Sequence, residues 1–209
     1  MIGVFGGSFD PIHFGHLDNT IAIKNELALS RLFLMPCANP VHKDKLNFST
    51  AQRLAMLRIV ENEFNDLSID TREIDRGGES YTIDSLKEIK TEHSKTAICL
   101  IIGADSFINL RSWKDWKEFK NYCHLVVINR PGINIAKDLT HNFKLTNSVD
   151  DLQSQASGYV YFANTPMLDI SSSDIRSIFS NDNLSGKIAK QKNLSDLLPD
   201  SIINYIKSL

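Results

Sequence analysis

The stretch of sequence that decides the fold is IGVFGGSFDPIHFGHL, residues 2–17. It opens with a short apolar run, Ile2–Phe5, which predicts a buried strand. The pair Gly6-Gly7 follows at once, and two glycines let the backbone turn tightly and approach a ligand without a side chain between them. His13 and His16 then stand at the expected mouth of a helix. The stretch therefore predicts a strand, a ligand-facing turn and a helix in direct succession.

Short apolar runs alternate with longer amphipathic runs along the rest of the chain. Further strands are predicted at Leu32–Met35, Leu67–Ile69, Ala97–Ile102, Leu125–Ile128 and Tyr159–Phe162. Helices are predicted at Leu17–Leu29, Thr50–Asn62, Thr82–Glu92, Lys114–Tyr122, Ser173–Phe179 and Ser201–Lys207. Several strand candidates are apolar on successive residues, which is typical of strands covered on both faces. The alternation predicts an α/β fold with a doubly wound, Rossmann-like parallel sheet.

The same reading divides the chain into two parts that form one structural unit. Residues 1–170 are predicted to be the α/β domain, and residues 171–209 a small helical C-terminal part packed on it. Thr140–Gly158 is polar and aperiodic, so it is predicted to be a loop. Ser49 is the predicted N-cap of the second helix.

Bulk composition limits the class of function. A chain of 209 residues with 42% hydrophobic and 23% charged residues suits one ordinary globular domain. The net charge of −2 favours neither nucleic acid nor a membrane surface as partner. No apolar run approaches the roughly 20 residues of a membrane helix, and no signal peptide is expected. Three scattered cysteines without a C-x-x-C pair predict reduced thiols and a cytoplasmic protein.

In a sheet of this kind, ligands bind beyond the carboxyl ends of the strands. The amides at the start of the first helix, together with His13 and His16, form a compact set of donors for phosphate oxygens. Three plainer interpretations remain open at this point. The glycine pair could be an ordinary turn, and the histidines could be structural or part of a zinc site. No further His/Cys cluster supplies the remaining zinc ligands, so no protein metal site is expected.

A second candidate anion site is Ile170-Ser171-Ser172-Ser173-Asp174-Ile175-Arg176. Hydroxyls and amides gather there at a predicted helix N-terminus, where the helix dipole favours anions. Arg176 adds a planar fork of donors suited to phosphate. The plainer alternative is a serine-rich N-cap beside a surface arginine.

The first motif resembles the signature of the HxGH nucleotidyltransferase superfamily, and the second resembles its I-S-S-T-x-I-R element. Ser173 stands where threonine is usual, which keeps the hydroxyl. Three further segments resemble the bacterial-type nicotinate-nucleotide adenylyltransferase family: residues 36–43, residues 80–82 and residues 102–116. The likeness covers residues 1 to about 130 and then 170–176. Val41 replaces the second proline of the commonest form of the acceptor loop.

The resemblance implies transfer of the adenylyl group of ATP to nicotinate mononucleotide, giving deamido-NAD and pyrophosphate. It implies that the catalytic residues are His13, His16 and Arg176. The ATP-binding residues it implies are Gly6, Gly7, Ser8, Phe9, His13, His16, Gly103, Asp105, Ser171, Ser172, Ser173 and Arg176. The substrate-binding residues it implies are Asn39, His42, Lys43, Tyr81, Thr82 and Trp113. Mg²⁺ is expected to accompany ATP, and a homo-oligomer remains open.

Several of these residues could have a structural role instead of a role in ligand binding. Asp105 could cap a helix rather than contact the ribose or a metal, and Lys43 could be a solvated surface lysine. Trp113 resembles the family position that stacks on the pyridine ring, whereas Trp116 is expected in the core. The amides at Tyr81-Thr82 could form a plain helix start or receive the nicotinate carboxylate.

Two other functions compete with the adenylyltransferase interpretation. A phosphopantetheine adenylyltransferase shares the first motif but fits the segments around Asn39, Thr82 and Trp113 poorly. A catalytically silent nucleotide sensor should have lost a phosphate donor, whereas both histidines and Arg176 are present. No serine, cysteine or lysine lies beside an obvious activating base, so direct in-line displacement without a covalent intermediate is expected.

Overall fold

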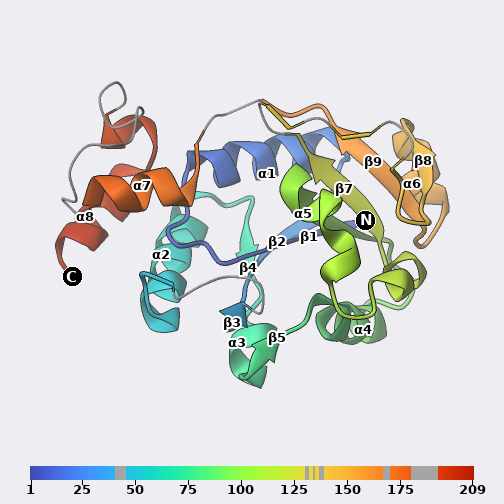
Figure 1. Ribbon diagram of the computed structural model, residues 1–209, viewed down its shortest axis with the longest axis horizontal. Coiled ribbons are helices and arrows are strands. Elements are labelled where there is room, and N and C mark those ends of the chain that lie inside the picture. Colours follow the sequence, from blue (N-terminus) through green and yellow to red (C-terminus); the bar gives the residue numbers. More distant parts are fainter. Residues whose placement is uncertain (41–45, 130–131, 134, 137–138, 167–169, 180–192) are drawn as a thin grey trace.

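The computed structural model describes residues 1–40, 46–129, 132–133, 135–136, 139–166, 170–179 and 193–209. Within them a seven-stranded sheet runs in the order β4-β2-β1-β6-β7-β9-β8, and all neighbouring strands are parallel (Figure 1). Its strands are β1 (Ile2–Gly7), β2 (Arg31–Pro36), β4 (Ser68–Ile69), β6 (Ile98–Gly103), β7 (His124–Ile128), β8 (Lys144–Thr146) and β9 (Tyr159–Ala163). A small second sheet pairs β3 (Asn39–Pro40) with β5 (Glu79–Ser80).

The strand order reverses between β1 and β6. From β1 the chain builds outward to β2 and β4, and it then crosses to the other side of β1 to build β6, β7 and β9. This is the doubly wound topology that the sequence predicts, so the fold class is confirmed. The crevice outside the carboxyl ends of β1 and β6 is the place where such a sheet binds ligands.

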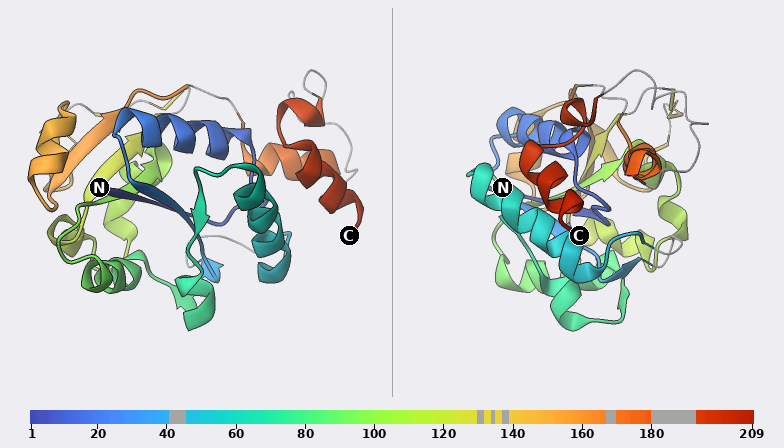
Figure 2. Two further views of the ribbon diagram at one scale, coloured as in Figure 1. Left: turned by 180° about the vertical axis from the view of Figure 1, so that it is seen from behind. Right: turned by 90° about the vertical axis from the view of Figure 1, so that its left-hand side faces the viewer.

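Helices cover both faces of the sheet, as Figures 1 and 2 show. One face packs against α1 (Phe14–Glu26), α2 (Thr50–Glu63), α7 (Ser172–Phe179) and α8 (Asp200–Lys207). The other packs against α4 (Thr82–Glu92), α5 (Ala104–Ile108) and the 3-10 helices η1 (Leu110–Ser112) and η2 (Trp116–Asn121). Strand β6 contributes side chains to the hydrophobic core on each face of the sheet. Cys99 and Ile101 pack on the α1 side, and Leu100 packs on the α4 side. Shorter elements are α3 (Arg72–Arg76), α6 (Val149–Ser154) and η3 (Leu194–Asp196).

The C-terminal helices pack onto the α/β layers. Ile175 of α7 and Ile202 of α8 belong to the same buried cluster as Met56 of α2, and α8 lies beside α2 (Figure 2). The amide of Phe14 donates to the carbonyl of Leu197 at 3.0 Å. The start of α1 is therefore tied to the end of the chain, and the boundary at residue 170 stays a prediction.

Two predictions about local structure are wrong. Thr140–Gly158 is not all loop, because it contains β8 and α6. Both are too short for periodicity to reveal them: α6 has six residues, and Leu152 is its buried side chain. The helix predicted at Lys114–Tyr122 is only the 3-10 helix η2, which follows Asp115 in the left-handed conformation at φ 49°. Phe119 is the buried residue of η2, so no apolar stripe supports a full α-helix there.

The start of α2 confirms the predicted cap. The Ser49 hydroxyl accepts a hydrogen bond from the amide of Gln52 at 3.3 Å, and the Gln52 side chain accepts one from the amide of Ser49 at 2.8 Å. This reciprocal pair is a capping box. Among the described residues, no helix is long and apolar enough to cross a membrane.

His124 is a buried histidine held in its neutral form at the start of β7. Its Nδ1 accepts a hydrogen bond from the amide of Tyr159 at 3.2 Å, so its Nε2 carries the proton and donates to the carbonyl of Gln155 at 3.0 Å. Burial lowers the pKa of His124, and protonating Nδ1 would set two N–H groups against each other.

This arrangement makes the free energy of unfolding depend on pH. The unfolded chain protonates His124 near pH 6.5, whereas the folded chain resists protonation, so stability is lost as pH falls below that value. The loss due to His124 is at most about 1.4 kcal/mol per pH unit. We expect denaturant unfolding between pH 7.5 and 5.5 to show a smaller loss of stability in His124→Gln than in wild type. His93→Gln, at the partly exposed end of α4, is the control. Identical pH slopes in wild type and His124→Gln would contradict the prediction.

Candidate active site

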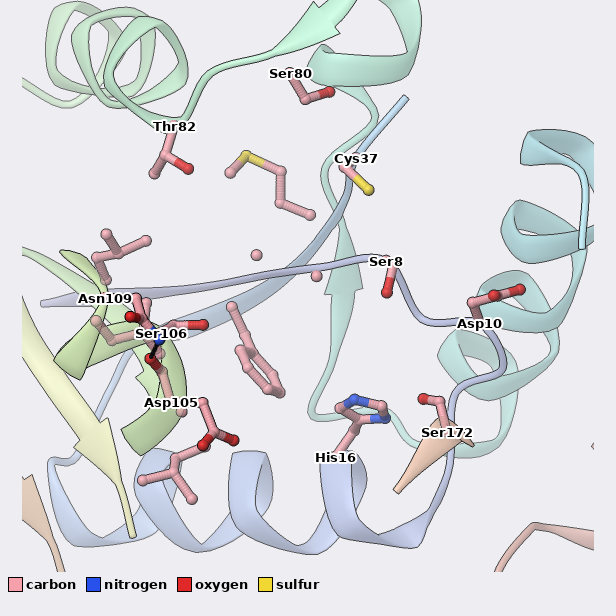
Figure 3. A pocket seen from close by; sticks show the side chains of 18 of the residues that line it. Ser8, Asp10, His16, Cys37, Ser80, Thr82, Asp105, Ser106, Asn109 and Ser172 are labelled. Carbon is pink, nitrogen blue, oxygen red and sulfur yellow. Dashed lines mark hydrogen bonds between the residues drawn. The ribbon is translucent and has the colours of Figure 1, made fainter. Parts of the chain in front are cut away.

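A cleft of about 900 Å³ opens at the carboxyl ends of β1 and β6, where the strand order reverses (Figure 3). It gathers most of the residues that the sequence singled out. Those lining it are Gly6, Gly7, Ser8, His13, His16, Tyr81, Thr82, Gly103, Asp105, Trp113, Ser171, Ser172, Ser173 and Arg176. They come from segments up to 170 residues apart, so the fold alone assembles the site.

The turn after β1 forms the floor of the cleft. A Cβ added at Gly7 would lie 3.1 Å from the ring of Phe9, which is buried and has φ 47°. Phe9 itself does not line the cleft. Its ring packs below the turn, edge-on to Phe5 at 5.8 Å and to His16 at 5.3 Å between centroids. A side chain at position 7 would therefore press on the Phe9 ring, and glycine lets the turn pack closely against it.

The two histidines lie together at the start of α1. His13 is the N-cap residue, with extended backbone, and His16 sits in the first turn. Their rings stack with centroids 3.6 Å apart and an interplanar angle of 27°. His13 is buried, and the ring of His16 rises from α1 into the cleft (Figure 3). Two imidazoles thus meet the positive end of a helix dipole at one point, which is an arrangement suited to phosphate oxygens.

The start of α7 closes the same end of the cleft. The Ser171 hydroxyl accepts a hydrogen bond from the amide of Asp174 at 3.1 Å and so caps the helix. The Ser172 hydroxyl donates to the carbonyl of Pro11 at 3.1 Å, which joins α7 to the turn after β1. A second helix N-terminus therefore faces the cleft beside the first one.

Arg176 and Asp10 fix this junction. Arg176 donates from Nη1 to the Asp10 carbonyl at 2.9 Å and from Nη2 to the Ser173 hydroxyl at 3.0 Å. The carboxylate of Asp10 lies 3.5 Å from Nη1 and accepts the amides of Asn47 and Phe48 at 3.1 and 2.9 Å. Sequence reasoning missed Asp10, although its place in the first motif was a signal. Its buried carboxylate orients the guanidinium.

The opposite half of the cleft is built around the start of α4. Tyr81 is the N-cap residue and Thr82 begins the helix, so the unpaired amides of a helix start lie at the cleft. Lys114, which the sequence did not suggest, pairs with the Asp84 carboxylate at 3.1 Å and places Nζ 4.4 Å from the centre of the Tyr81 ring. Trp113 packs edge-on against Phe119 at 6.0 Å, while Trp116 stands away from the cleft against His141. This half presents an aromatic surface, helix amides and a cation.

The third wall follows β6. Gly103 caps α5, and Asp105, Ser106 and Asn109 lie on or beside that short helix (Figure 3). The side chain of Asn109 donates to the carbonyl of Asp105 at 2.9 Å. Ser106 and Asn109 were not predicted, because nothing in the sequence distinguishes them from surface residues. Among the described residues, no three His, Cys, Asp or Glu side chains cluster to hold a metal ion.

Of the predicted substrate-binding residues, one does not line the cleft and two are not described by the structure. Asn39 lies in β3, where its side chain donates to the carbonyl of Gly78 at 3.1 Å, and it does not line the cleft. His42 and Lys43, together with Val41 between Pro40 and His42, lie outside the described residues. Their proposed roles stay predictions.

Comparison with known proteins agrees with this geometry. The model of the cytidylyltransferase-like family matches residues 4–178. A curated protein named probable nicotinate-nucleotide adenylyltransferase, from Vesicomyosocius okutanii subsp. Calyptogena okutanii, is 54% identical over 209 residues, which is 100% of this chain and 95% of that protein. One of the same name from Psychromonas ingrahamii is 40% identical over 210 residues, covering 99% and 94% of the two chains.

Solved structures share the fold. The Plasmodium falciparum nicotinic acid mononucleotide adenylyltransferase complexed with NaAD superposes with a TM-score of 0.72 at 21% identity, covering 99% of this chain and 94% of that one. The same protein complexed with APC gives a TM-score of 0.71. With near-complete coverage at 54% identity and the family model spanning most of its length, this chain belongs to the nicotinate-nucleotide adenylyltransferase family.

Proposed function

We propose that this protein transfers the adenylyl group of ATP to nicotinate mononucleotide, a step in NAD biosynthesis. A phosphate oxygen of the mononucleotide attacks the α-phosphorus of ATP. The bond from that phosphorus to the oxygen bridging it to the β-phosphate breaks, and pyrophosphate leaves with the electron pair. The products are deamido-NAD and pyrophosphate.

The observation that carries this proposal is the pairing of two unlike half-sites in one cleft. One half joins the starts of α1 and α7 with His16 and Arg176, which suits a polyphosphate. The other joins the start of α4 with Trp113 and Lys114, which suits a flat ring that carries a carboxylate. A dinucleotide product requires both halves side by side.

We assign the chemistry to alignment and charge stabilisation. His13, His16 and Arg176 would donate to oxygens of the α-phosphate and of the departing pyrophosphate, where negative charge grows in the transition state. Holding two substrates in line supplies much of the remaining rate enhancement. The mononucleotide already carries its nucleophile, so the enzyme needs no covalent intermediate.

Mg²⁺ fits this site as a companion of ATP. Among the described residues, three carboxyl groups line the cleft: Asp105 lies on α5, Glu73 accepts a hydrogen bond from the Ser85 hydroxyl, and Asp10 accepts two amides and pairs with Arg176. That donor set suits an ion held mainly by phosphate oxygens and water, with Asp105 in reach of the nucleotide. The ion would neutralise charge on the phosphates.

We also propose that the protein works in the cytoplasm. Its three cysteines are buried free thiols, which suits a reducing compartment. Burial raises the pKa of Cys99 to about 12, so this thiol is inert.

A pyrophosphate-release assay tests the proposed reaction. Purified protein with ATP and Mg²⁺ should release pyrophosphate and form deamido-NAD when nicotinate mononucleotide is added. Parallel reactions contain nicotinamide mononucleotide or phosphopantetheine. Faster turnover of phosphopantetheine would overturn the assignment, and release of no pyrophosphate with any acceptor would favour a nucleotide sensor.

Trp113 should set the affinity for the mononucleotide. Removing its ring takes away an aromatic face from the acceptor half and leaves the phosphate half untouched. We expect Trp113→Ala to raise KM for nicotinate mononucleotide by about tenfold, the scale of one lost aromatic contact. KM for ATP should change little, and Trp113→Phe should recover most of the loss. A defect confined to ATP would move Trp113 out of the pyridine pocket.

A further inference from the structure

A charged residue that the reaction scheme does not use is buried beneath the cleft. Arg53 lies in the second turn of α2 and is 0% exposed. Among the described residues it forms no ion pair with a carboxylate. Burying a cation in this way costs folding free energy, and its neutral partners offset only part of that cost. Because burying Arg53 costs folding free energy, the packing of α2 alone does not explain why an arginine occupies this position.

Three hydrogen bonds of Arg53 reach carbonyls of the two loops that leave β1 and β2, and another goes to the Thr50 hydroxyl of its own helix. Its Nη1 donates to the carbonyl of Ser8 at 2.8 Å. Its Nη2 donates to the carbonyls of Cys37 and Ala38 at 2.8 and 3.1 Å. Ser8 is the first residue after β1 and Cys37 the first after β2, and both line the cleft. The guanidinium thus spans the gap between two neighbouring strands just past their carboxyl ends.

The connection continues into the acceptor half. The amide of Ala38 donates to the hydroxyl of Ser80 at 2.9 Å, and Ser80 directly precedes Tyr81, the N-cap residue of α4. Ser80 in turn hydrogen-bonds the buried carboxyl of Glu73, which also accepts a hydrogen bond from the Ser85 hydroxyl at 2.9 Å. Figure 3 shows Ser80 and Cys37 on the side of the cleft opposite His16. One chain of contacts therefore runs from the phosphate turn through Arg53 to the acceptor half.

We propose that Arg53 is a positioning residue that sets the spacing between the ATP half and the acceptor half of the cleft. This inference rests on the proposed function. The guanidinium suits the task because its planar fork reaches carbonyls on both loops at once, whereas a lysine ammonium would reach only part of the set. In-line transfer depends on this spacing, since a misplacement of about 1 Å can lower a rate by about a hundredfold.

Three variants distinguish the effect of Arg53 on the spacing of the two half-sites from the effects of its charge and of its packing. Arg53→Lys keeps the charge and removes the fork, and Arg53→Met removes both. Arg58→Lys is the matched control, because Arg58 lies five residues further along α2, exposed and paired with Glu61 at 2.7 Å. Each protein is assayed for kcat, for thermal stability, and for its affinity for three ligands. The ligands are a non-hydrolysable ATP analogue, nicotinate mononucleotide and deamido-NAD.

If Arg53 is a positioning residue, its variants should lose kcat and affinity for deamido-NAD, while their affinity for each single substrate stays nearly unchanged. Arg53→Lys should lower kcat at least about tenfold, and binding of the ATP analogue or the mononucleotide alone should stay within about threefold of wild type. Affinity for deamido-NAD, which fills both halves at once, should weaken about tenfold. Arg58→Lys should match wild type throughout.

Other outcomes would overturn the inference. Wild-type kcat in Arg53→Lys would mean that charge alone suffices, and equal weakening of all three ligands would mean that Arg53 only supports the fold. If the arginine variants do not fold, Ser80→Ala breaks the same chain of contacts and leaves Arg53 in place; because it also removes a hydrogen-bond donor to Glu73, its thermal stability is measured alongside. A Ser80→Ala protein that loses kcat and deamido-NAD affinity but still binds each single substrate supports the inference. Wild-type kcat and wild-type affinities in Ser80→Ala overturn it. Failure of the proposed function is distinct, because the wild type itself would then form no deamido-NAD.

Discussion

Replacing His16 with alanine is expected to lower kcat by about 10²–10³, the scale for loss of one preorganised donor to a developing charge. The ring of His16 rises from the first turn of α1 into the cleft and stacks on His13 at 3.6 Å between centroids. Because His16 is only half-buried, its removal should leave the fold intact. KM for either substrate should change less than kcat, since the lost interaction is strongest in the transition state.

The measurement is steady-state pyrophosphate release, with circular dichroism to confirm that the variant is folded. His93→Ala serves as the matched control, because His93 is the C-cap of α4, at the opposite end of that helix from the start that lines the cleft. A kcat within a few-fold of wild type in a folded His16→Ala protein would place this ring away from the reacting phosphate. The control should keep full activity.

Wild-type kcat/KM should favour nicotinate over nicotinamide mononucleotide by at least about tenfold. The amides at the start of α4 can donate to both oxygens of a carboxylate, whereas a carboxamide turns its NH₂ toward one of them and leaves a donor unpaired. Lys114 should support this preference, since its ammonium lies 3.1 Å from the Asp84 carboxylate at the same helix start and offsets a negative charge that would repel a nicotinate carboxylate. Trp113 stacking would be shared by both nucleotides and adds no selectivity.

Both nucleotides are compared in the same assay, with wild type and two lysine variants. Lys114→Met should narrow the preference, and Lys117→Met, three residues further on and outside the cleft lining, should leave it unchanged. Equal use of the acid and the amide by wild type would refute the role given to the α4 amides. If Lys114→Met prefers nicotinate mononucleotide as strongly as wild type does, the α4 amides alone account for the selectivity.

The sheet and the turn from β1 into α1 could be predicted because local sequence determines them. Strands β6 and β7 are apolar on nearly every residue, which is what burial on both faces requires. His13 and His16 could be placed because a strand, a glycine turn and a helix follow each other within residues 2–17. A sequence pattern predicts the structure well wherever the residues that contact one another are close in the sequence.

The rest depends on contacts between distant segments. Arg53 donates to three carbonyls and a hydroxyl, and no pattern in the sequence marks which carbonyls a fold will bring together. Asp10 meets Arg176 only because α7 docks on the turn after β1. Element α6 was missed for a different reason, since six residues with one buried leucine carry too little periodicity.

The docking of α7 on the turn after β1 also makes the phosphate half depend on contacts between segments far apart in the sequence. Arg176 donates to the carbonyl of Asp10, 166 residues away, and the carbonyl of Leu197 accepts the amide of Phe14 at the start of α1. A fragment that contains β1, α1 and most of the sheet but not α7 would lack one wall of the cleft. We therefore expect such a fragment to bind ATP more weakly than the 209-residue chain.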